Sequence, residues 1–350
     1  MIQTTAIRDT FKTPFIVTWN TGRRCNLDCT YCEDTHHNNY SKHKSLDDFK
    51  NAFNFVDQWT KEYNADEVQI WFTGGEPTVN PDFWNFLEFI PEHYFIGVTT
   101  NGAWGPTNTQ RLIKYADAIT ISYHAEADSR LKLQIIENIF TISESSLGLQ
   151  VNLMMHMDFW DECVELYHRL KDANIKVMPR PIGDGNILRK GWFIDGDGNQ
   201  RRTSHEYTEQ QQQWYFNVKG IKYESKEKLE GSQLGRSCCG GRCLEGKINN
   251  EWKPISVINT EFKGWYCSVD NYFLHIDQET DLVYHHQTCQ VLPGGKKGPI
   301  GHLSESTKLL QELKDRLSNP QPMICPNLRC GCGMCVPKAA QLEDYKELFK

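Results

Sequence analysis

The sequence lacks the features of an exported, membrane-spanning or strongly basic protein. Its amino terminus has no apolar core followed by a cleavage site, and no apolar run approaches the length that crosses a bilayer. A formal net charge of −7 gives no general attraction to nucleic acid, although a local basic patch is not excluded. Thirteen cysteines in a chain without an export signal favour metal ligation over disulfides. We therefore expect a cytoplasmic protein that works in a reducing environment and has no membrane partner.

Three cysteines follow an apolar run, residues 15–21, that we expect to form a strand. Cys25, Cys29 and Cys32 have the spacing C-x3-C-x2-C. Three neighbouring thiolates suit a [4Fe–4S] cluster with one iron that has no protein ligand, and such an iron can bind a small molecule and pass it an electron. The alternative is a structural zinc site, which normally takes four protein ligands and favours two C-x2-C pairs.

A second motif, Thr73-Gly74-Gly75-Glu76-Pro77, follows an apolar strand predicted over residues 68–72. Paired glycines at a strand end let the backbone approach a ligand closely, because no Cβ intervenes. The adjacent glutamate is a pure acceptor that suits a cationic amine. Alone, such a sequence is more often an ordinary turn. Here the cysteine motif precedes it by about 45 residues, with one predicted helix between them.

Together with Tyr31, which stands before the third cysteine, these motifs resemble those of the radical S-adenosylmethionine (SAM) superfamily. The resemblance implies that SAM chelates the open iron and that Gly74, Gly75, Glu76 and Pro77 bind its amino group. It also implies reductive cleavage of SAM to a 5′-deoxyadenosyl radical, which abstracts a substrate hydrogen. An electron donor such as flavodoxin or ferredoxin is then required. The cofactor carries this chemistry, and the protein supplies placement and shielding.

Strands and helices alternate through the first half of the chain, which predicts a parallel sheet covered by crossover helices. We place strands at residues 15–21, 68–72, 95–100, 118–123, 149–155 and 175–178. Six such units form a partial (β/α)6 TIM-like barrel, the usual form of the resembled family. Sites in parallel β/α folds lie at the carboxyl ends of the strands.

That rule selects polar residues at successive strand ends: Thr100, Asn101, Ser122, His124, Asn152, Met178 and Arg180. The resemblance implies contacts of Ser122 and Asn152 with the carboxylate and ribose of SAM. His124 is a candidate catalytic acid or base because its pKa lies near neutrality, or else a strand-end histidine that the backbone satisfies. Met178 and Arg180 are candidates for the adenosine, although a methionine in a strand is more often a core residue.

Nine of the thirteen cysteines lie in the carboxyl-terminal third. Two alternating apolar runs around a polar turn at residues 278–281 predict a β-hairpin between Cys267 and Cys289. A hairpin flanked by cysteines and followed by a cysteine-rich knot resembles the SPASM/twitch extension, which carries auxiliary [4Fe–4S] clusters. The resemblance implies one or two such clusters, and a zinc knot is the alternative, because the spacing departs from the common pattern. The candidate ligands are Cys239, Cys243, Cys267, Cys289, Cys325, Cys330, Cys332 and Cys335.

These features divide the chain into four parts. Residues 1–182 form the barrel, residues 183–236 a polar bridging segment, residues 237–337 a small cysteine-rich α+β domain with the hairpin, and residues 338–350 a terminal helix. Enzymes of the resembled kind mostly modify peptide or protein side chains, and the alternative is radical modification of a nucleoside, a nucleic-acid base or another small molecule. About fourteen residues precede the first barrel strand, so we expect either that a separate protein presents a peptide substrate or that the substrate is not a leader peptide. A non-catalytic iron–sulfur carrier would need neither the Gly-Gly-Glu-Pro motif nor the polar strand ends.

Overall fold

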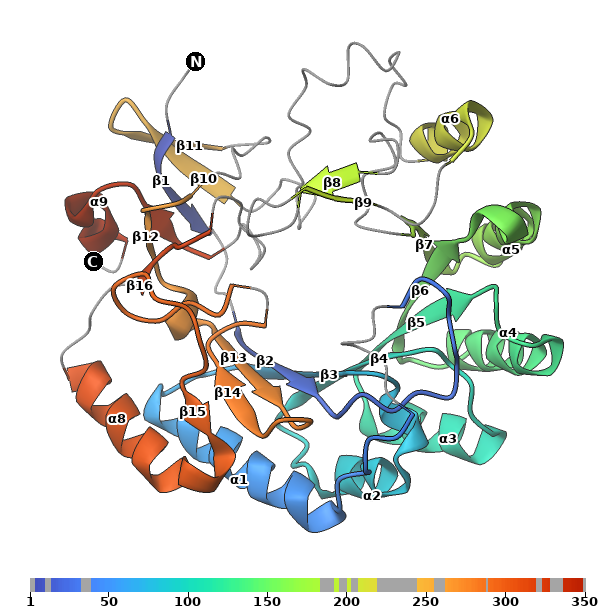
Figure 1. The fold of residues 1–350 in the computed structure, drawn as a ribbon, viewed down its shortest axis with the longest axis horizontal. Coiled ribbons are helices and arrows are strands. Elements are labelled where there is room, and N and C mark those ends of the chain that lie inside the picture. Colours follow the sequence, from blue (N-terminus) through green and yellow to red (C-terminus); the bar gives the residue numbers. More distant parts are fainter. Residues whose placement is uncertain are drawn as a thin grey trace.

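The computed structural model describes residues 4–9, 14–32, 39–182, 192–194, 200–202, 207–218, 244–254, 262–287, 289–318, 323–327 and 336–348. A curved nine-stranded sheet carries an outer layer of helices, and a smaller six-stranded sheet lies beside one end of it (Figure 1). Within the described residues, no helix is long and apolar enough to cross a membrane.

The nine-stranded sheet has the order β15-β14-β13-β2-β3-β4-β5-β6-β7, and the seven strands from β13 to β7 run parallel. All six predicted barrel strands are present, with ends shifted by three residues at most. This confirms the mixed α/β architecture with a parallel sheet. The barrel strands are β2 (Phe15–Asn20), β3 (Val68–Thr73), β4 (Phe95–Thr100), β5 (Ala118–His124), β6 (Gly148–Met155) and β7 (Lys176–Pro181).

The crossover helices cover the convex face of this sheet (Figure 1). The first of them begins at a capping box, in which Ser45 accepts from the backbone N–H of Asp48 and the Asp48 side chain accepts in return. Its Phe49 stacks on Phe86 of the next helix, with ring centroids 4.8 Å apart. Removing either buried ring would cost about 3–5 kcal/mol. The helices are α1 (Leu46–Glu62), α2 (Pro81–Phe89), α3 (Pro106–Tyr115), α4 (Ser129–Ser143) and α5 (Trp160–Asp172), with short 3-10 turns at Pro77–Val79 and Met157–Phe159.

Alternation along the strands separates an apolar face from a polar one. In β5, Ile119, Ile121 and Tyr123 are buried in the core under the helices, whereas Ser122 and His124 are only partly buried on the opposite, concave face. The same alternation holds in β2, β3 and β6. The concave face therefore carries both polar and partly exposed apolar side chains, and it is the face on which a ligand can be bound.

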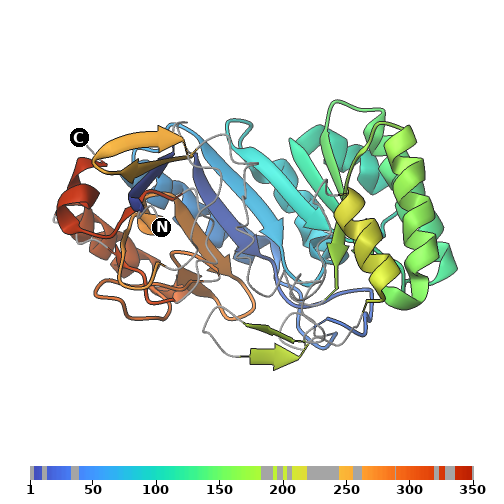
Figure 2. The same cartoon turned by 90° about the horizontal axis from the view of Figure 1, so that it is seen from above.

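Prolines mark the open edge of the barrel. The last strand, β7, extends beyond its predicted end at Met178 to include Pro179 and Pro181. A proline has no N–H to donate to a further strand, so these residues suit an edge. Helix α6 (Glu209–Val218) lies beside α5 near this edge (Figure 2), and its Trp214 contacts Trp160 with ring centroids 5.5 Å apart. The bridging segment therefore packs partly on the helical layer. The other described elements of the bridging segment are the strands β8 (Trp192–Ile194) and β9 (Gln200–Arg202), which pair with each other in a two-stranded sheet.

The predicted hairpin is confirmed, but it extends the barrel sheet. Strand β13 (Phe273–Asp277) pairs antiparallel with β14 (Leu282–Tyr284) and parallel with β2. Strand β15 (Gly301–His302) completes this edge, and helix α8 (Ser306–Ser318) packs beside α1. The pairing of β13 with β2 joins segments more than 250 residues apart, for which the local sequence pattern carries no signal.

The second sheet has the order β11-β10-β1-β17-β12-β16. It places the amino-terminal strand between two strands of the carboxyl-terminal third, which the sequence did not predict. The predicted terminal helix is shorter than expected, α9 (Leu342–Glu347), and it contacts β17, β1 and β12 of the second sheet. The strands are β1 (Thr4–Asp9), β10 (Leu244–Ile248), β11 (Glu251–Pro254), β12 (Tyr266–Cys267), β16 (Met323–Ile324) and β17 (Lys338–Ala339), with 3-10 turns at Val269–Asn271 and Leu303–Glu305 nearby.

Candidate functional site

The cysteine loop leaves the carboxyl end of β2 and lies over the edge of the concave face. Burial raises the pKa of the Cys25 thiol to about 11 and that of Cys29 to about 12. The charges of Glu76 and Glu126 act in the same direction on Cys25 and Cys29, respectively. At neutral pH these thiols therefore deprotonate only when a metal replaces the proton.

The three thiols fit a cluster better than a single ion. Cys25, Cys29 and Cys32 are close enough to affect one another's pKa. Yet no three His, Cys, Asp or Glu side chains of the described ranges surround one point as ligands of a single metal ion would. A [4Fe–4S] cube takes each thiolate on a different iron, so its ligands stand apart at separate corners. The donor set of this loop therefore fits a cluster with one open iron, and the described residues offer no fourth protein ligand beside it for zinc.

The Gly-Gly-Glu-Pro loop packs directly against the start of the cysteine loop. The backbone N–H of Gly75 donates to the carbonyl of Gly22, and that of Glu76 donates to Arg24, both at 2.8 Å. A Cβ on Gly75 would lie 2.4 Å from the carbonyl oxygens of Arg23 and Arg24, and a Cβ on Gly74 would lie 2.5 Å from that of Gly22. We expected the glycines to admit a ligand. In the structure they admit the backbone that carries Cys25.

Glu76 connects this loop to the end of β4. One carboxylate oxygen accepts from the hydroxyls of Thr78 (2.6 Å) and Thr100 (2.7 Å), and the other accepts from the backbone N–H of Asn101 at 2.5 Å. Burial raises the pKa of Glu76, and these hydrogen bonds oppose the shift. Pro77 starts the 3-10 turn that follows. Glu76 therefore gathers Thr100 and Asn101, two of the predicted site residues, beside the cysteine loop.

Asn101 reaches the cysteine loop itself. Its side-chain amide donates to Asn26 Oδ1 at 2.7 Å and lies 3.8 Å from Cys25 Sγ, which also receives the backbone N–H of Leu27 at 3.4 Å. Hydrogen bonds to ligand sulfurs tune the potential of an iron–sulfur cluster. Asn101 therefore connects the end of β4 to the cysteine loop.

Tyr31 and His124 meet on the other side of the loop. The Tyr31 hydroxyl lies 2.6 Å from His124 Nδ1, Cys29 Sγ lies 3.4 Å from the same nitrogen, and the two rings stack with centroids 5.9 Å apart. Burial lowers the pKa of His124 to about 4, and the charge of Glu126 opposes that shift. His124 is therefore neutral at pH 7. His124 contacts the cysteine loop. The sequence predicted either a catalytic acid or base or a histidine hydrogen-bonded to the backbone, and neither interpretation included this contact.

Sequence reasoning missed two further residues that hold the loop. Glu126 accepts from the backbone N–H of Thr30 at 3.0 Å and from its hydroxyl at 2.6 Å. His156 Nε2 lies 3.3 Å from Glu126 Oε1. Glu126 lies two residues after β5 and His156 directly after β6, so the strand-end rule that selected Ser122 and His124 would also have found them.

The remaining predicted SAM residues form one row across the concave face. Ser122, Asn152 and Met178 are register neighbours on β5, β6 and β7. Asn152 Oδ1 accepts from Arg180 Nε at 3.3 Å and from Gln150 Nε2 at 3.2 Å. The structure thus joins Asn152 and Arg180 and places the row on the face that the cysteine loop overlies.

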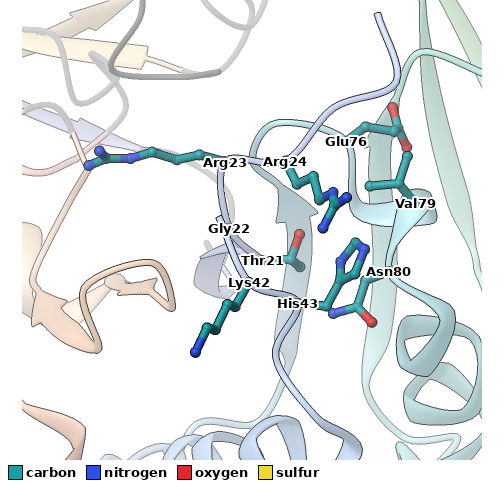
Figure 3. A pocket seen from close by; sticks show the side chains of 9 residues that line it. All are labelled: Thr21, Gly22, Arg23, Arg24, Lys42, His43, Glu76, Val79 and Asn80. Carbon is teal, nitrogen blue, oxygen red and sulfur yellow. The ribbon is translucent and has the colours of Figure 1, made fainter. Parts of the chain in front are cut away.

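A small pocket opens behind the cysteine loop, between the ends of β2 and β3 (Figure 3). Arg24 projects into it toward His43, whereas Arg23 and Lys42 point away (Figure 3). Arg24 and Lys42 are exposed, so this side of the loop is positively charged although the chain as a whole is acidic. The lining consists of Thr21, Gly22, Arg23, Arg24, Lys42, His43, Glu76, Val79 and Asn80.

Three candidate auxiliary ligands are described, and all three are buried. Cys267 and Cys289 share an apolar cluster with Met323. Cys325 follows two residues later, and its backbone N–H donates to Trp265 at 2.8 Å. The fold therefore gathers cysteines from three separate segments. The other candidates, Cys239, Cys243, Cys330, Cys332 and Cys335, lie outside the described residues.

Comparison with protein families gives a match to the radical SAM superfamily over residues 19–185. This span contains the cysteine loop, the Gly-Gly-Glu-Pro loop and every predicted strand-end residue. The chain therefore contains a radical SAM domain and is a radical SAM enzyme. A [4Fe–4S] cluster and SAM are the cofactors that this domain implies. No curated protein matched the chain.

Among solved structures, polyhistidine-tagged anSMEcpe with bound AdoMet matches with a TM-score of 0.48 at 13% sequence identity, over 85% of this chain and 80% of that chain. Native anSMEcpe with bound AdoMet and the Cp18Cys peptide matches over the same shares at 15% identity, also with a TM-score of 0.48. BtrN in complex with AdoMet and 2-DOIA matches at 13% identity over 90% of this chain and 92% of that chain, with a TM-score of 0.38.

Proposed function

We propose that this radical SAM enzyme abstracts a hydrogen atom from a side chain of a peptide or protein. The observation that carries the proposal is the character of the concave face beside the cysteine loop. Its partly exposed positions on β2 to β6 are apolar or polar but carry no Lys, Arg, Asp or Glu. A phosphate-bearing substrate would need cationic partners there. The face carries charge on its flanking strand β7, at Arg180, whereas the uncharged part from β2 to β6 suits the amides and side chains of a peptide.

The residues of the chain have separate tasks in this proposal. When bound, the cluster and SAM supply the one-electron chemistry that produces the hydrogen-abstracting radical. Cys25, Cys29 and Cys32 would hold the cluster, Asn101 donates toward Cys25, and Glu126 holds the turn of the loop at Thr30. Ser122, Asn152, Met178 and Arg180 would orient SAM, along with Tyr31 and the Gly74–Pro77 loop.

The carboxyl-terminal third is proposed to hold one or two auxiliary [4Fe–4S] clusters, as in a SPASM/twitch domain. The support is the burial of Cys267, Cys289 and Cys325, which three separate segments bring into one region of the fold. Anaerobic reconstitution followed by iron, sulfide and zinc counting tests this. Roughly eight or more irons per chain are expected, because each cube holds four. About four irons with stoichiometric zinc would reduce this region to a zinc knot.

We also propose that an acidic one-electron carrier, such as a flavodoxin or ferredoxin, docks beside the cysteine loop. The exposed charges of Arg24 and Lys42 support this, since complementary charge accelerates association. Reduction by the carrier should therefore slow as salt rises, whereas reduction by dithionite should change much less. Equal salt dependence for both reductants would contradict the proposal.

Deuterium transfer tests the substrate class directly. The reconstituted enzyme is incubated with SAM, dithionite and either a tryptic digest of perdeuterated protein or a mixture of perdeuterated nucleosides. Mass spectrometry then measures deuterium in the 5′-deoxyadenosine product. We expect transfer from the peptide digest, and a Cys29→Ala variant should form no product from either mixture. Transfer from nucleosides alone would replace the proposal with nucleoside modification.

A further inference from the structure

Trp71 lies flat on the concave face of the barrel, on β3, which pairs with β2, the strand that precedes the cysteine loop. Its neighbours Ile70 and Phe72 are buried under the helices, so Trp71 points to the concave side, where it remains partly exposed. Its register partner on β4 is Gly97. Trp71 belongs to neither the cysteine loop nor the row predicted to bind SAM.

The geometry at Gly97 shows how the indole is oriented. A Cβ on Gly97 would lie 2.3, 2.5 and 2.6 Å from Cε3, Cδ2 and Cζ3 of Trp71, three consecutive atoms of the six-membered ring. Nearly equal distances to consecutive atoms place that Cβ above the ring face, because an approach at the ring edge would leave two of the three clearly farther away. One face of the indole therefore covers the bare backbone of β4, which explains why Gly97 is buried. The other face is turned toward the concave space.

Two further contacts hold the ring in this orientation. The indole N–H donates to Gln69 Oε1 at 3.3 Å, and Gln69 is itself held by Glu67 at 2.9 Å. Phe95 lies beside the indole with ring centroids 5.9 Å apart. The ring is thus fixed before any ligand arrives, and a rigid aromatic surface binds with little loss of side-chain entropy.

The surroundings indicate what kind of ring this surface receives. The register neighbour of Trp71 on β2 is Thr18. On β4, the next partly exposed residue after Gly97 is Thr99. Next to Thr18, the buried ring of His275 places Nδ1 2.9 Å from the Thr18 hydroxyl and 3.0 Å from the Thr18 carbonyl, and so positions Thr18. The two threonine hydroxyls can bind amides and hydroxyls, and neither of them is a cation for a phosphate.

We propose that the exposed face of Trp71 is a stacking surface for an aromatic side chain of the peptide substrate. The inference rests on the proposed function and deepens it by naming the side-chain class that the barrel accommodates. Aromatic pairs contribute beyond the area that they bury. Loss of the Trp71 ring should therefore weaken binding of an aromatic peptide roughly two- to tenfold.

Fluorine NMR on the SAM-loaded, reconstituted enzyme labelled with 5-fluorotryptophan tests this. The chain has ten tryptophans, and the Trp71 resonance is assigned by its loss in Trp71→Phe, with Trp71→Tyr as a second assignment variant. The probes are the amidated tripeptide Ac-Gly-Tyr-Gly, its leucine analogue Ac-Gly-Leu-Gly, and adenosine. We expect the tyrosine peptide to shift the Trp71 resonance through its ring current and the leucine peptide to leave it in place.

A matched pair of glycine variants adds a structural control. Gly97→Ala would push the indole off the sheet and should abolish the shift, whereas Gly105→Ala meets open space and should retain it. Equal shifts with both peptides, or no shift with either, would overturn the inference. A shift with adenosine alone would overturn the peptide assignment in favour of a nucleobase. Formation of 5′-deoxyadenosine by the same samples separates these results from failure of the proposed function.

Discussion

Replacing Gly75 by alanine should displace the cysteine loop and remove its cluster. The new Cβ would lie 2.4 Å from two backbone carbonyl oxygens, those of Arg23 and Arg24, and neither can rotate away as a flexible side chain would. Cys25 follows Arg24 directly in the chain. We therefore expect Gly75→Ala to lower cluster content as well as SAM affinity, because a Cβ at residue 75 meets the metal-binding loop.

The magnitude follows from the contacts at this junction. Two backbone hydrogen bonds join the loops, from Gly75 to Gly22 and from Glu76 to Arg24. Each contributes about 1 kcal/mol, and overpacking of a tight site typically costs about 1–3 kcal/mol. We expect a loss of about 2 kcal/mol or more in the free energy of unfolding of the barrel. In a domain of this size that corresponds to a fall of roughly 4 °C or more in Tm.

The assay compares iron content after anaerobic reconstitution and Tm for three proteins, namely wild type, Gly75→Ala and Gly105→Ala. Gly105 precedes α3, and a Cβ there meets nothing within 4 Å. Gly105→Ala should therefore retain full iron and lose less than about 1 kcal/mol. If Gly75→Ala binds as much iron as wild type and has the same Tm as Gly105→Ala, then the two loops do not depend on each other, contrary to what their contacts indicate.

Four further predictions concern the same region. Replacing the three cysteines of the C-x3-C-x2-C loop by alanine should remove one cube's iron and all 5′-deoxyadenosine formation under dithionite; residual product would contradict the assignment. Glu126→Ala should lower cluster content after reconstitution, because hydrogen bonds to a carboxylate contribute about 1.5–3 kcal/mol each, whereas Glu126→Gln, which keeps one acceptor oxygen, should lose less. Ser122→Ala and Asn152→Ala should each weaken SAM binding by about 1 kcal/mol, roughly fivefold, as measured by calorimetry; unchanged affinity would remove that residue from the SAM site. Burial lowers the pKa of His275 from 6.5 to about 4, and the charge of Asp277 opposes that shift. The unfolded chain therefore binds a proton at this residue between pH 6.5 and 4 while the folded chain does not, so stability is lost as pH falls through this window, by up to about 3 kcal/mol. Denaturant titrations should show a flatter pH dependence for His275→Gln, and an unchanged slope would exclude this residue as a source.

Much of the barrel was predictable from local patterns. The alternation of apolar and polar residues is a property of a few neighbouring positions, so it indicated all six barrel strands and the β13–β14 hairpin. The cysteine spacing and the Gly-Gly-Glu-Pro motif indicated the radical SAM domain for the same reason, because each motif is contiguous and its chemistry depends on residue type. The strand-end rule then selected Asn101, Ser122 and Asn152.

Only the tertiary structure decided which distant segments meet. Pairing of β13 with β2 and insertion of β1 between β10 and β17 join segments more than 200 residues apart, and a strand's own alternation does not specify its partner. The close packing of Gly75 on Arg23 and Arg24 was also not predictable from the sequence. A glycine in a motif indicates that a side chain would not fit there, but it does not indicate which residues occupy the space. The flat orientation of Trp71 likewise depends on Gly97, a residue of another strand. The sequence determines which groups are available and on which face they lie, and the register of the folded sheet determines which of them come into contact.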